Sequence, residues 1–311
     1  MPPPESGRTG DGDAASLLGP EGVVPSGWRL EEIDDPEDAR LDAYRRLTDM
    51  DLRRTVEVEG GYFMAEGRLV IERVAAAGYS LQSVLTAPRW LGALSSSLGS
   101  FEGPVYLARQ EVVDAIAGFR VHRGALAVVR RPPPRPVEEF LSGSGHLLLL
   151  EDLVDHTNVG LAFRSAGALG VAGVVLSSRC ADPLYRRSVK ASMGAVLAVP
   201  WARSQDWDHD LDAVSHAAIS SIALTPDPTA PTLDAVLAGR RHERVALLVG
   251  SEGPGLSPRA LRACETAARI PMHHGIDSLN AAAAVAVASY ALLTTARSAS
   301  HDSRISAEGD G

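Results

Sequence analysis

The feature that most constrains the fold is a series of short apolar runs in the second half of the chain. Four of them read HLLLLEDL, VAGVVLS, SSIALTP and VALLVG, and segments of helical periodicity such as HTNVGLAFRSAGALG lie between them. Continuous apolar strands are buried on both faces, which is typical of a parallel sheet covered by helices. This half of the chain predicts a doubly wound α/β sheet with ligand loops at the carboxyl ends of its strands.

The remaining segments of this half fit the same alternation. LAVPW and ARIPM are predicted to be further strands, and PLYRRSVKASMGAV and residues 208–218 further helices. SLNAAAAVAVASYALLTTAR is predicted to be the closing helix. Its apolar part is too short to cross a bilayer, so no membrane segment is expected.

The first half predicts a smaller α/β unit in which strands alternate with helices of about ten residues. An amphipathic helix over DARLDAYRRLTDMDLRR precedes it, with Leu41, Tyr44, Leu47 and Leu52 near one face. The predicted strands are GGYFMAEG, SLQSVLTA, PVYLAR and GALAVVR, and the helices are RLVIERVAAAG and EVVDAIAGF.

A break in composition at RRPPPRPVEEFLSGSG separates the halves, because proline blocks regular structure and the Gly/Ser cluster adds flexibility. Both ends of the chain are polar, and the start is rich in proline, glycine and acid. The predicted organisation is a disordered segment 1–25, a smaller α/β domain 26–130, a linker 131–145, a larger α/β domain 146–298 and a disordered tail 299–311.

Composition sets weak limits on function. The formal net charge of -9 argues mildly against a nucleic-acid partner, although much of the acid lies near the amino terminus. The two cysteines, Cys180 and Cys264, have neither metal-ligand nor disulfide spacing, so buried, inert thiols in a reducing compartment are expected. No secretory signal is recognised. We therefore expect a soluble cytoplasmic protein.

Three loops lie where such a sheet binds its ligand. The first, DHTNVGLAFRSAGALG, carries Asn158 and Arg164, and the second, GSEGPGLSP, carries Glu252. In the third, IPMHHGIDSLNAAAA, a strand passes through a turn into the last helix, with Asp277 or Ser278 as the expected N-cap. Each has an ordinary alternative when taken singly: a surface arginine, a helix N-cap, or glycines that only turn the chain.

Two adjacent histidines in the third loop invite a metal hypothesis. His273 and His274 would point apart on a turn, and no acidic or cysteine partner lies at ligand spacing. No metal is therefore expected.

Taken together, the three loops resemble the SpoU (TrmH-like) family of RNA 2'-O-ribose methyltransferases, within the SPOUT superfamily. The resemblance runs from about residue 147 to 297 and rests on NVGLAFRSAGALG, VALLVGSEGPGLS and IPMHHGIDSLNAAAA in this order. The first half is more loosely similar to the family's substrate-binding domain, through YFMAEGRLVIERVAAAG and HRGALAVV.

The resemblance implies a fold, a cofactor and partners. The fold is a parallel SPOUT sheet with a deep trefoil knot, a feature that periodicity cannot reveal. The cofactor is S-adenosyl-L-methionine, bound by backbone groups, and the partners are structured RNA and a second copy of the chain in a homodimer. The implied cofactor-binding residues are Gly250, Ile270 and Leu279, with Gly255, Leu256 and Met272 beside them.

The resemblance also implies catalytic residues for attack of a ribose 2'-hydroxyl on the methyl group. Arg164 is the central one; as a literal base it would have to lose a proton at a cost of roughly 7 kcal/mol at pH 7. We therefore expect it to bind a phosphate and stabilise the developing alkoxide. Asn158 and Glu252 are expected to orient Arg164 and the ribose, and Ser278 and Asn280 to hydrogen-bond the hydroxyl or its phosphate.

The RNA-binding surface is less defined. Four arginines on or after the first helix could contact phosphates, or could form a solvated face balanced by Asp42, Asp49 and Asp51. Ribosomal and transfer RNA remain equally open as substrates. The four arginines are Arg45, Arg46, Arg53 and Arg54.

Two other functions compete with the methyltransferase hypothesis. A non-catalytic RNA-binding or ribosome-assembly protein that retains the fold would be favoured by loss of Arg164 or Asn280, and both are present. A nucleotide-binding enzyme acting on a small molecule would require a glycine-rich turn after the first strand, where the chain reads LEDLVDHTN instead.

Overall fold

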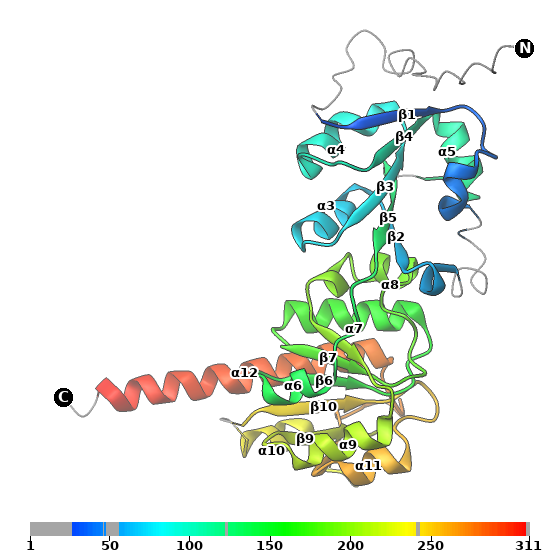
Figure 1. Ribbon diagram of the computed structural model, residues 1–311. Helices are drawn as coiled ribbons and strands as arrows, with labels where there is room; N and C mark the ends of the chain where they lie inside the picture. Colours follow the sequence, from blue (N-terminus) through cyan, green and yellow to red (C-terminus); the bar gives the residue numbers. More distant parts are fainter. Residues whose placement is uncertain (1–26, 46, 48–55, 122–123, 241–242, 309–311) are drawn as a thin grey trace, which may run out of the picture. The chain divides into compact units, whose positions relative to one another are not determined.

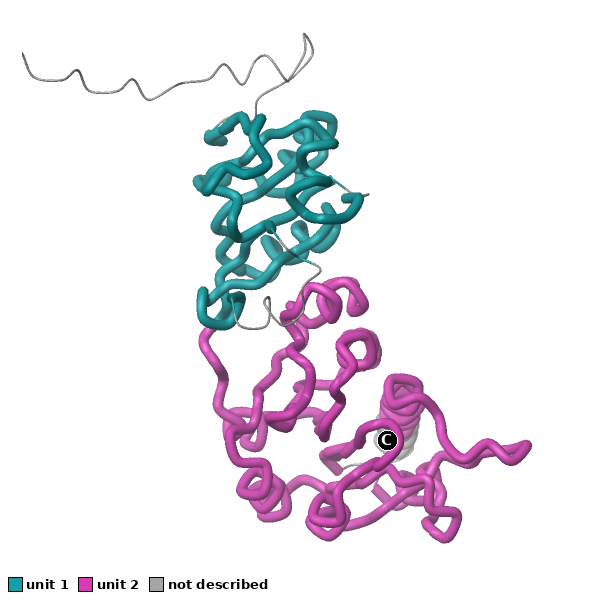
Figure 2. The backbone as a smooth tube through the Cα atoms, turned by 90° about the vertical axis from the view of Figure 1, so that its right-hand side faces the viewer, with its two compact units in different colours: residues 1–132 teal, residues 133–311 magenta. Residues whose placement is uncertain are grey.

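The computed structural model describes residues 27–45, 47, 56–121, 124–240 and 243–308 (Figure 1). The chain divides into two compact units, Met1–Pro132 and Pro133–Gly311, each built around its own sheet (Figure 2). The division falls between two prolines at the start of the expected linker. Each unit is described here by itself.

The first unit contains a mixed five-stranded sheet of order β1-β4-β3-β5-β2. β5 is antiparallel to both of its neighbours, whereas β1, β4 and β3 pair in parallel. The strands are β1 (Arg29–Ile33), β2 (Tyr62–Glu66), β3 (Leu81–Thr86), β4 (Pro104–Ala108) and β5 (Ala125–Arg130).

Helices cover both faces of this sheet (Figure 1). α3 (Arg68–Ala76) packs beside α4 (Leu91–Leu98), which follows the short 3-10 helix η2 (Pro88–Trp90), and α5 (Gln110–Ala117) packs beside the 3-10 helix η1 (Ala39–Tyr44). Successive side chains of a strand point to opposite faces, so both layers receive apolar residues from the same strands. The α5 layer encloses a core that includes Tyr44, Met64, Tyr106 and Ile116.

The predicted helix over 38–54 is only partly realised in the described residues. It is the 3-10 helix η1, whose start is capped by Asp38. Leu41, Tyr44 and Leu47 are buried as the pattern predicts, and Leu52 lies outside the described residues. The sequence pattern did not predict β1 or α4, because RLEEI is half polar and LGALSSSL is rich in serine.

The second unit contains six parallel strands in the order β11-β9-β10-β6-β7-β8, which confirms the predicted parallel sheet. β11 covers only part of the strand expected at ARIPM, because Ile270, Pro271 and Met272 lie beyond it in irregular structure. The strands are β6 (Leu147–Leu150), β7 (Gly173–Leu176), β8 (Trp201–Arg203), β9 (Ser220–Leu224), β10 (Val245–Val249) and β11 (Thr266–Ala268).

Helices form a layer on each side of this sheet. α6 (Glu138–Ser142), α9 (Trp207–His216) and α11 (Pro258–Ala263) share one core with the sheet, through Phe140, Leu211 and Ala260 among others. In the other layer, α7 packs against α8, the 3-10 helix η3 and α12, and α12 packs against α10. The bounds of these elements are α7 (His156–Ala168), α8 (Arg186–Ala191), η3 (Ala195–Leu197), α10 (Leu233–Ala238) and α12 (Ala281–Glu308).

The neighbouring strands β6 and β10 form the switch point of the sheet. β6 leads into α7 in one layer, and β10 leads into α11 in the other. Because the two connections leave in opposite directions, a crevice is expected outside the carboxyl ends of these strands. This is the edge where the first two predicted loops begin.

The ends of the second unit differ from the predicted boundaries. α6 lies inside the expected linker, and Val137 and Phe140 are buried there, so this part of the segment belongs to the core. α12 continues to Glu308, whereas a disordered tail was expected from residue 299. The trefoil knot stays a prediction.

Within the described ranges, none of the helices has the length and apolar character needed to cross a bilayer.

Candidate active site

The glycine loop after β10 folds back tightly on itself. The amide of Gly255 donates to the carbonyl of Ser251 at 3.1 Å, and these two residues form an isolated bridge. A Cβ atom on Gly250 would lie 2.3 Å from the backbone of Gly255 and Leu256. Gly253 and Gly255 have φ angles of 91° and 71°, which favour glycine. The glycines are therefore required by the path of the loop.

The three predicted loops meet through the side chains of Asn158, Glu252 and Asn280. The side-chain nitrogen Nδ2 of Asn158 donates to Glu252 Oε1 at 2.9 Å. The side-chain nitrogen Nδ2 of Asn280 donates to Asn158 Oδ1 at 3.0 Å and also to Glu252 Oε1. Residues far apart in sequence thus form one hydrogen-bonded junction at the switch point.

Local structure explains how the junction is positioned. The side chain of Asp155 caps α7, because its Oδ1 accepts from the backbone N–H of Asn158 at 2.9 Å. Asn280 Oδ1 accepts from the backbone amides of Ala282 and Ala283 at 3.0 and 3.3 Å. Asn280 therefore caps α12, which begins later than expected, and the prediction of Asp277 or Ser278 as the cap was wrong. The Glu252 carboxylate lies at the amino terminus of α12, where a negative charge is stabilised by the helix dipole.

Arg164 lies outside this junction. It is on α7, its side chain is exposed, and no hydrogen bond or ion pair joins it to the residues that the structure describes. Asn158 and Glu252 were expected to orient Arg164, but they bond to each other and to Asn280 instead. The guanidinium is therefore available to a ligand.

The third loop, residues 269–280, is irregular and largely exposed. Ile270 and Met272 are half-buried, and Ser278 is exposed without a hydrogen bond to any described residue. Two apolar side chains, Ile276 and Leu279, are 60% and 37% exposed. The loop therefore offers both polar backbone and uncovered apolar surface near the junction.

Glu151 is a further site residue that the sequence patterns did not single out. It follows β6 directly and is 5% exposed. Its Oε1 accepts from Trp207 Nε1 and Ser257 Oγ, both at 2.8 Å, and its Oε2 accepts from the amide of Ser257 at 2.7 Å. The available signal was a carboxylate directly after the apolar run LLLL, at the edge where ligands bind.

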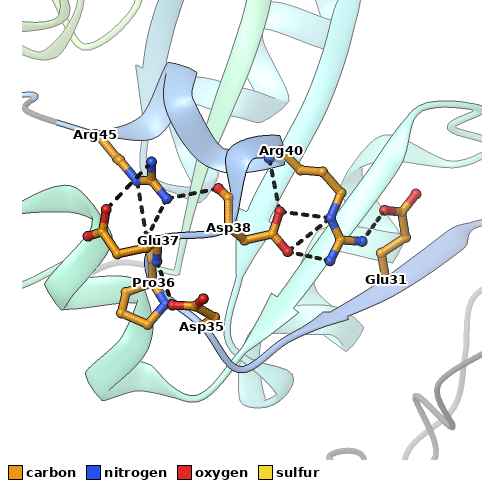
Figure 3. Close-up of polar contacts among 7 residues, drawn as sticks. All are labelled: Glu31, Asp35, Pro36, Glu37, Asp38, Arg40 and Arg45. Carbon is orange, nitrogen blue, oxygen red and sulfur yellow. Dashed lines mark hydrogen bonds and ion pairs between the residues drawn. The ribbon is translucent and has the colours of Figure 1, made fainter. Parts of the chain in front are cut away.

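The arginines expected to contact RNA in the first unit are not free where the structure describes them. Arg45 donates to the carbonyls of Pro36 and Asp38 at 2.8 and 2.9 Å and to Asp42 Oδ1 at 2.7 Å (Figure 3 shows the first two). This pairing fits the alternative of a charge-balanced surface. Arg46, Arg53 and Arg54 lie outside the described residues.

The two histidines of the third loop lie apart from the ligand-type side chains that come close together. Within the described part of the chain, the group of ligand-type side chains that come close together is Glu138, His209 and Asp210. His273 and His274 do not belong to it, and their ring centroids are 6.5 Å apart.

Comparison with known proteins gives one family. The SpoU rRNA Methylase family matches residues 145–290. An uncharacterized tRNA/rRNA methyltransferase of Mycobacterium bovis is 40% identical over 266 residues, which cover 86% of this chain and 92% of the relative. A 23S rRNA (guanosine-2'-O-)-methyltransferase, RlmB, of a Burkholderia species is 30% identical over 176 residues, 55% of this chain and 70% of the relative.

Solved structures give the same fold. The AdoMet-bound rRNA methyltransferase of Sinorhizobium meliloti superposes with a TM-score of 0.71 at 24% identity, over 86% of this chain and 97% of its own. The family match, together with this fold, indicates the class of S-adenosylmethionine-dependent RNA methyltransferases with the SPOUT architecture. Within that class, this chain belongs to the SpoU rRNA methylase family.

Proposed function

We propose that this protein transfers a methyl group from S-adenosylmethionine to a ribose 2'-hydroxyl of ribosomal or transfer RNA. The observation that carries the proposal is the Asn158–Glu252–Asn280 junction at the switch point. Arg164 lies on the same helix as Asn158 and is exposed, with no hydrogen bond or ion pair to a residue that the structure describes. A small-molecule nucleotide enzyme is not supported, because the glycine turn follows β10 and none follows β6.

The residues around the junction fit the methyl donor. The loop at 250–256 has open space beside Gly253, where an added Cβ would meet nothing within 4 Å, so its backbone can be approached there. Ile276 and Leu279 supply exposed apolar surface for a flat ring. Gly250, Gly255, Leu256, Ile270, Met272 and Leu279 are the proposed contacts. When bound, S-adenosylmethionine supplies a methyl group already activated as a sulfonium.

Arg164 is proposed to act on the RNA side of the reaction. Its guanidinium, which is exposed and not engaged by any described residue, can hold an RNA phosphate through two parallel hydrogen bonds and stabilise negative charge developing on the 2'-oxygen. Ser278 is also exposed and has no hydrogen bond to a described residue, and it is proposed to hydrogen-bond the same hydroxyl or its phosphate. The junction of Asn158, Glu252 and Asn280 joins the amino-terminal ends of α7 and α12. The ribose would bind between these two helix ends.

The name of the RlmB relative, a 23S rRNA (guanosine-2'-O-)-methyltransferase, favours the 2'-hydroxyl as the acceptor. The relative with 40% identity carries both tRNA and rRNA in its name, so the RNA class stays open between the two. The methylation assay must therefore include both ribosomal RNA and transfer RNA as substrates.

A homodimer is proposed from the family resemblance and from exposed apolar side chains in one layer of the second unit. Leu161 on α7 is 37% exposed, and Val287 and Tyr290 on α12 are 44% and 59% exposed. α7 and α12 pack against each other. Val287 and Tyr290 are three residues apart on a helix and so lie on the same face.

The test incubates the purified protein with tritiated S-adenosylmethionine and, separately, ribosomal and transfer RNA from a strain lacking the protein. We expect label in one pool, resistant to alkaline cleavage at the labelled nucleotide. Arg164→Ala should reduce methyl transfer by at least about 100-fold, because it removes a charge-stabilising donor, while cofactor affinity is unchanged. Arg262→Ala, an exposed arginine on α11 in the opposite layer, is the matched control.

Each other outcome has a defined meaning. Label that is sensitive to alkali would indicate a methylated base and contradict the proposed acceptor. Binding of cofactor and RNA without transfer to either pool or to precursor RNA would favour the non-catalytic assembly role. Failure to bind S-adenosylmethionine would contradict the proposal as a whole.

A further inference from the structure

Glu151 contacts the glycine loop at both of its ends. Its backbone amide donates to the carbonyl of Val249 at 2.9 Å, one residue before Gly250. Its side chain accepts from the amide and hydroxyl of Ser257, one residue after Leu256. Glu151, the residue that directly follows β6, therefore connects the point where the glycine loop leaves the sheet with the point where the loop enters α11.

The contacts continue into two neighbouring elements. Trp207, the first residue of α9, donates its indole N–H to the same carboxylate at 2.8 Å. The hydroxyl of Ser257 also accepts from the amide of Ala260 at 3.0 Å and so caps α11. The loop is thus held at its base by Glu151 and at its tip by the Glu252 junction.

The chemistry at this position requires a carboxylate. All three partners donate hydrogen bonds, and an ionised carboxylate only accepts. A glutamine of the same shape would present an NH₂ group to at least one of these donors, leaving a buried donor unpaired. Glu151 is nearly fully buried, so water cannot replace the lost bond.

We propose that Glu151 is a positioning residue for S-adenosylmethionine binding, which fixes the base of the glycine loop without contacting the cofactor or the RNA. This inference rests on the proposed function of the loop. Its effect is expected on cofactor affinity and on KM for the cofactor, not on kcat, because the methyl-transfer geometry is restored once the cofactor fills the loop.

The test compares the intact protein with Glu151→Gln and Trp207→Phe. Calorimetry should show Glu151→Gln binding S-adenosylmethionine about tenfold more weakly, and Trp207→Phe, which removes only one donor, about threefold more weakly. At saturating cofactor, kcat should stay within about twofold of the wild-type value. Amide hydrogen exchange without cofactor should accelerate in residues 250–260 of Glu151→Gln and remain unchanged in the first unit.

Glu265→Gln is the matched control, since Glu265 is an exposed carboxylate of the same unit that pairs with Arg240. It should leave cofactor affinity and exchange in the loop unchanged. Trp207→Phe keeps the carboxylate and so tests the inference even where Glu151→Gln does not fold.

Two failures are distinguishable. If the wild-type protein binds S-adenosylmethionine and Glu151→Gln binds it equally well, the inference about Glu151 is overturned and the proposed function stands. A loss of kcat without a change in affinity would also overturn it. If the wild-type protein itself does not bind the cofactor, the proposed function falls and the inference falls with it.

Discussion

Single residues at this site differ in how far the sequence predicted them. Asn158, Glu252 and Asn280 were predicted as site residues from the loops that carry them, and the structure brings all three together. Their pairing was not predictable, because the contacts span 94 and 122 positions along the chain. Glu151 was missed for a related reason: one carboxylate after an apolar run has no pattern until Ser257 and Trp207 are seen around it.

The two cysteines give a prediction at the residue scale. Burial raises the pKa of the Cys264 thiol to about 12, and burial also raises the pKa of Cys180. Because the thiolate is the reactive form, neither thiol of the native protein should react with a disulfide reagent within minutes at pH 8. Both should react after unfolding in guanidinium chloride. Absorbance of the released thiol measures the reaction.

The same raised pKa values set a pH dependence of stability. The unfolded chain ionises its thiols at about pH 8.5, whereas the native state keeps Cys264 protonated up to about pH 12. The contribution is complete below the unfolded pKa and is lost as pH rises towards the folded one. The free energy of unfolding should therefore be lower at pH 10 than at pH 8. This decrease should be smaller in Cys264→Ala, which lacks the Cys264 thiol. Rapid labelling of either thiol in the native protein at pH 8 would contradict its raised pKa.

At the scale of elements, close backbone approaches decide where glycine is needed. On α7, a Cβ on Gly160 would lie 2.5 Å from the carbonyl oxygen of Ser188 and 2.7 Å from Ala191 Cβ, so α8 packs directly on the helix backbone. In the loop after β10, Gly250 approaches the backbone of Gly255 equally closely. The sequence marks both positions as glycine, but only the packing distinguishes them from glycines that are free to change.

Gly250→Ala tests the loop as an element. The added methyl group would lie 2.3 Å from two backbone atoms, so the return of the chain at Gly255 must shift. We expect cofactor binding to be lost and the free energy of unfolding to fall by about 1–3 kcal/mol. Calorimetry and urea denaturation measure the two effects.

Two glycines serve as controls for that substitution. Gly253 has open space but a φ of 91°, so Gly253→Ala should cost about 1 kcal/mol from backbone strain without blocking loop closure. Gly92 on α4 has open space and a helical backbone, so Gly92→Ala should stabilise the first unit by up to about 1 kcal/mol. Normal cofactor affinity in Gly250→Ala would contradict the close approach.

At the scale of the whole molecule, the chain consists of two units with separate cores. The sheet of each unit is complete in itself, and α6 closes the core of the second unit from within the expected linker. The composition break at 130–145 indicated the division, but it could not show that Val137 and Phe140 are core residues. Prolines at 132–134 dominated the pattern there and concealed a short helix.

The separate cores predict that the second unit folds without the first. A fragment of residues 133–311 should show a single cooperative thermal transition and bind S-adenosylmethionine with the affinity of the full chain. It should lose most methyl transfer to RNA, since the first unit is the expected substrate-binding domain. Calorimetry and the tritium assay check both points; a fragment without a cooperative transition would contradict the autonomy of this unit.

The proposed dimer gives a second prediction at this scale. Tyr290→Asp introduces a charge into the exposed apolar face of α12 and should convert a dimer into a monomer, seen by sedimentation velocity as a halved mass. Leu69→Asp, on an exposed apolar position of α3, is the control and should not change the mass. A wild-type protein that sediments as a monomer would contradict the proposal.

The sequence by itself determined the parallel α/β sheet, the three loops at its edge and the residue types of the junction. These follow from local physics: apolar runs must be buried, glycine permits a tight return, and amides and carboxylates pair where strands end. Only the tertiary structure decided which strands are neighbours, and therefore that the loops after β6 and β10 leave in opposite directions beside each other. Strand order depends on contacts between distant segments, and it is this order that places Glu151 beside both ends of the glycine loop.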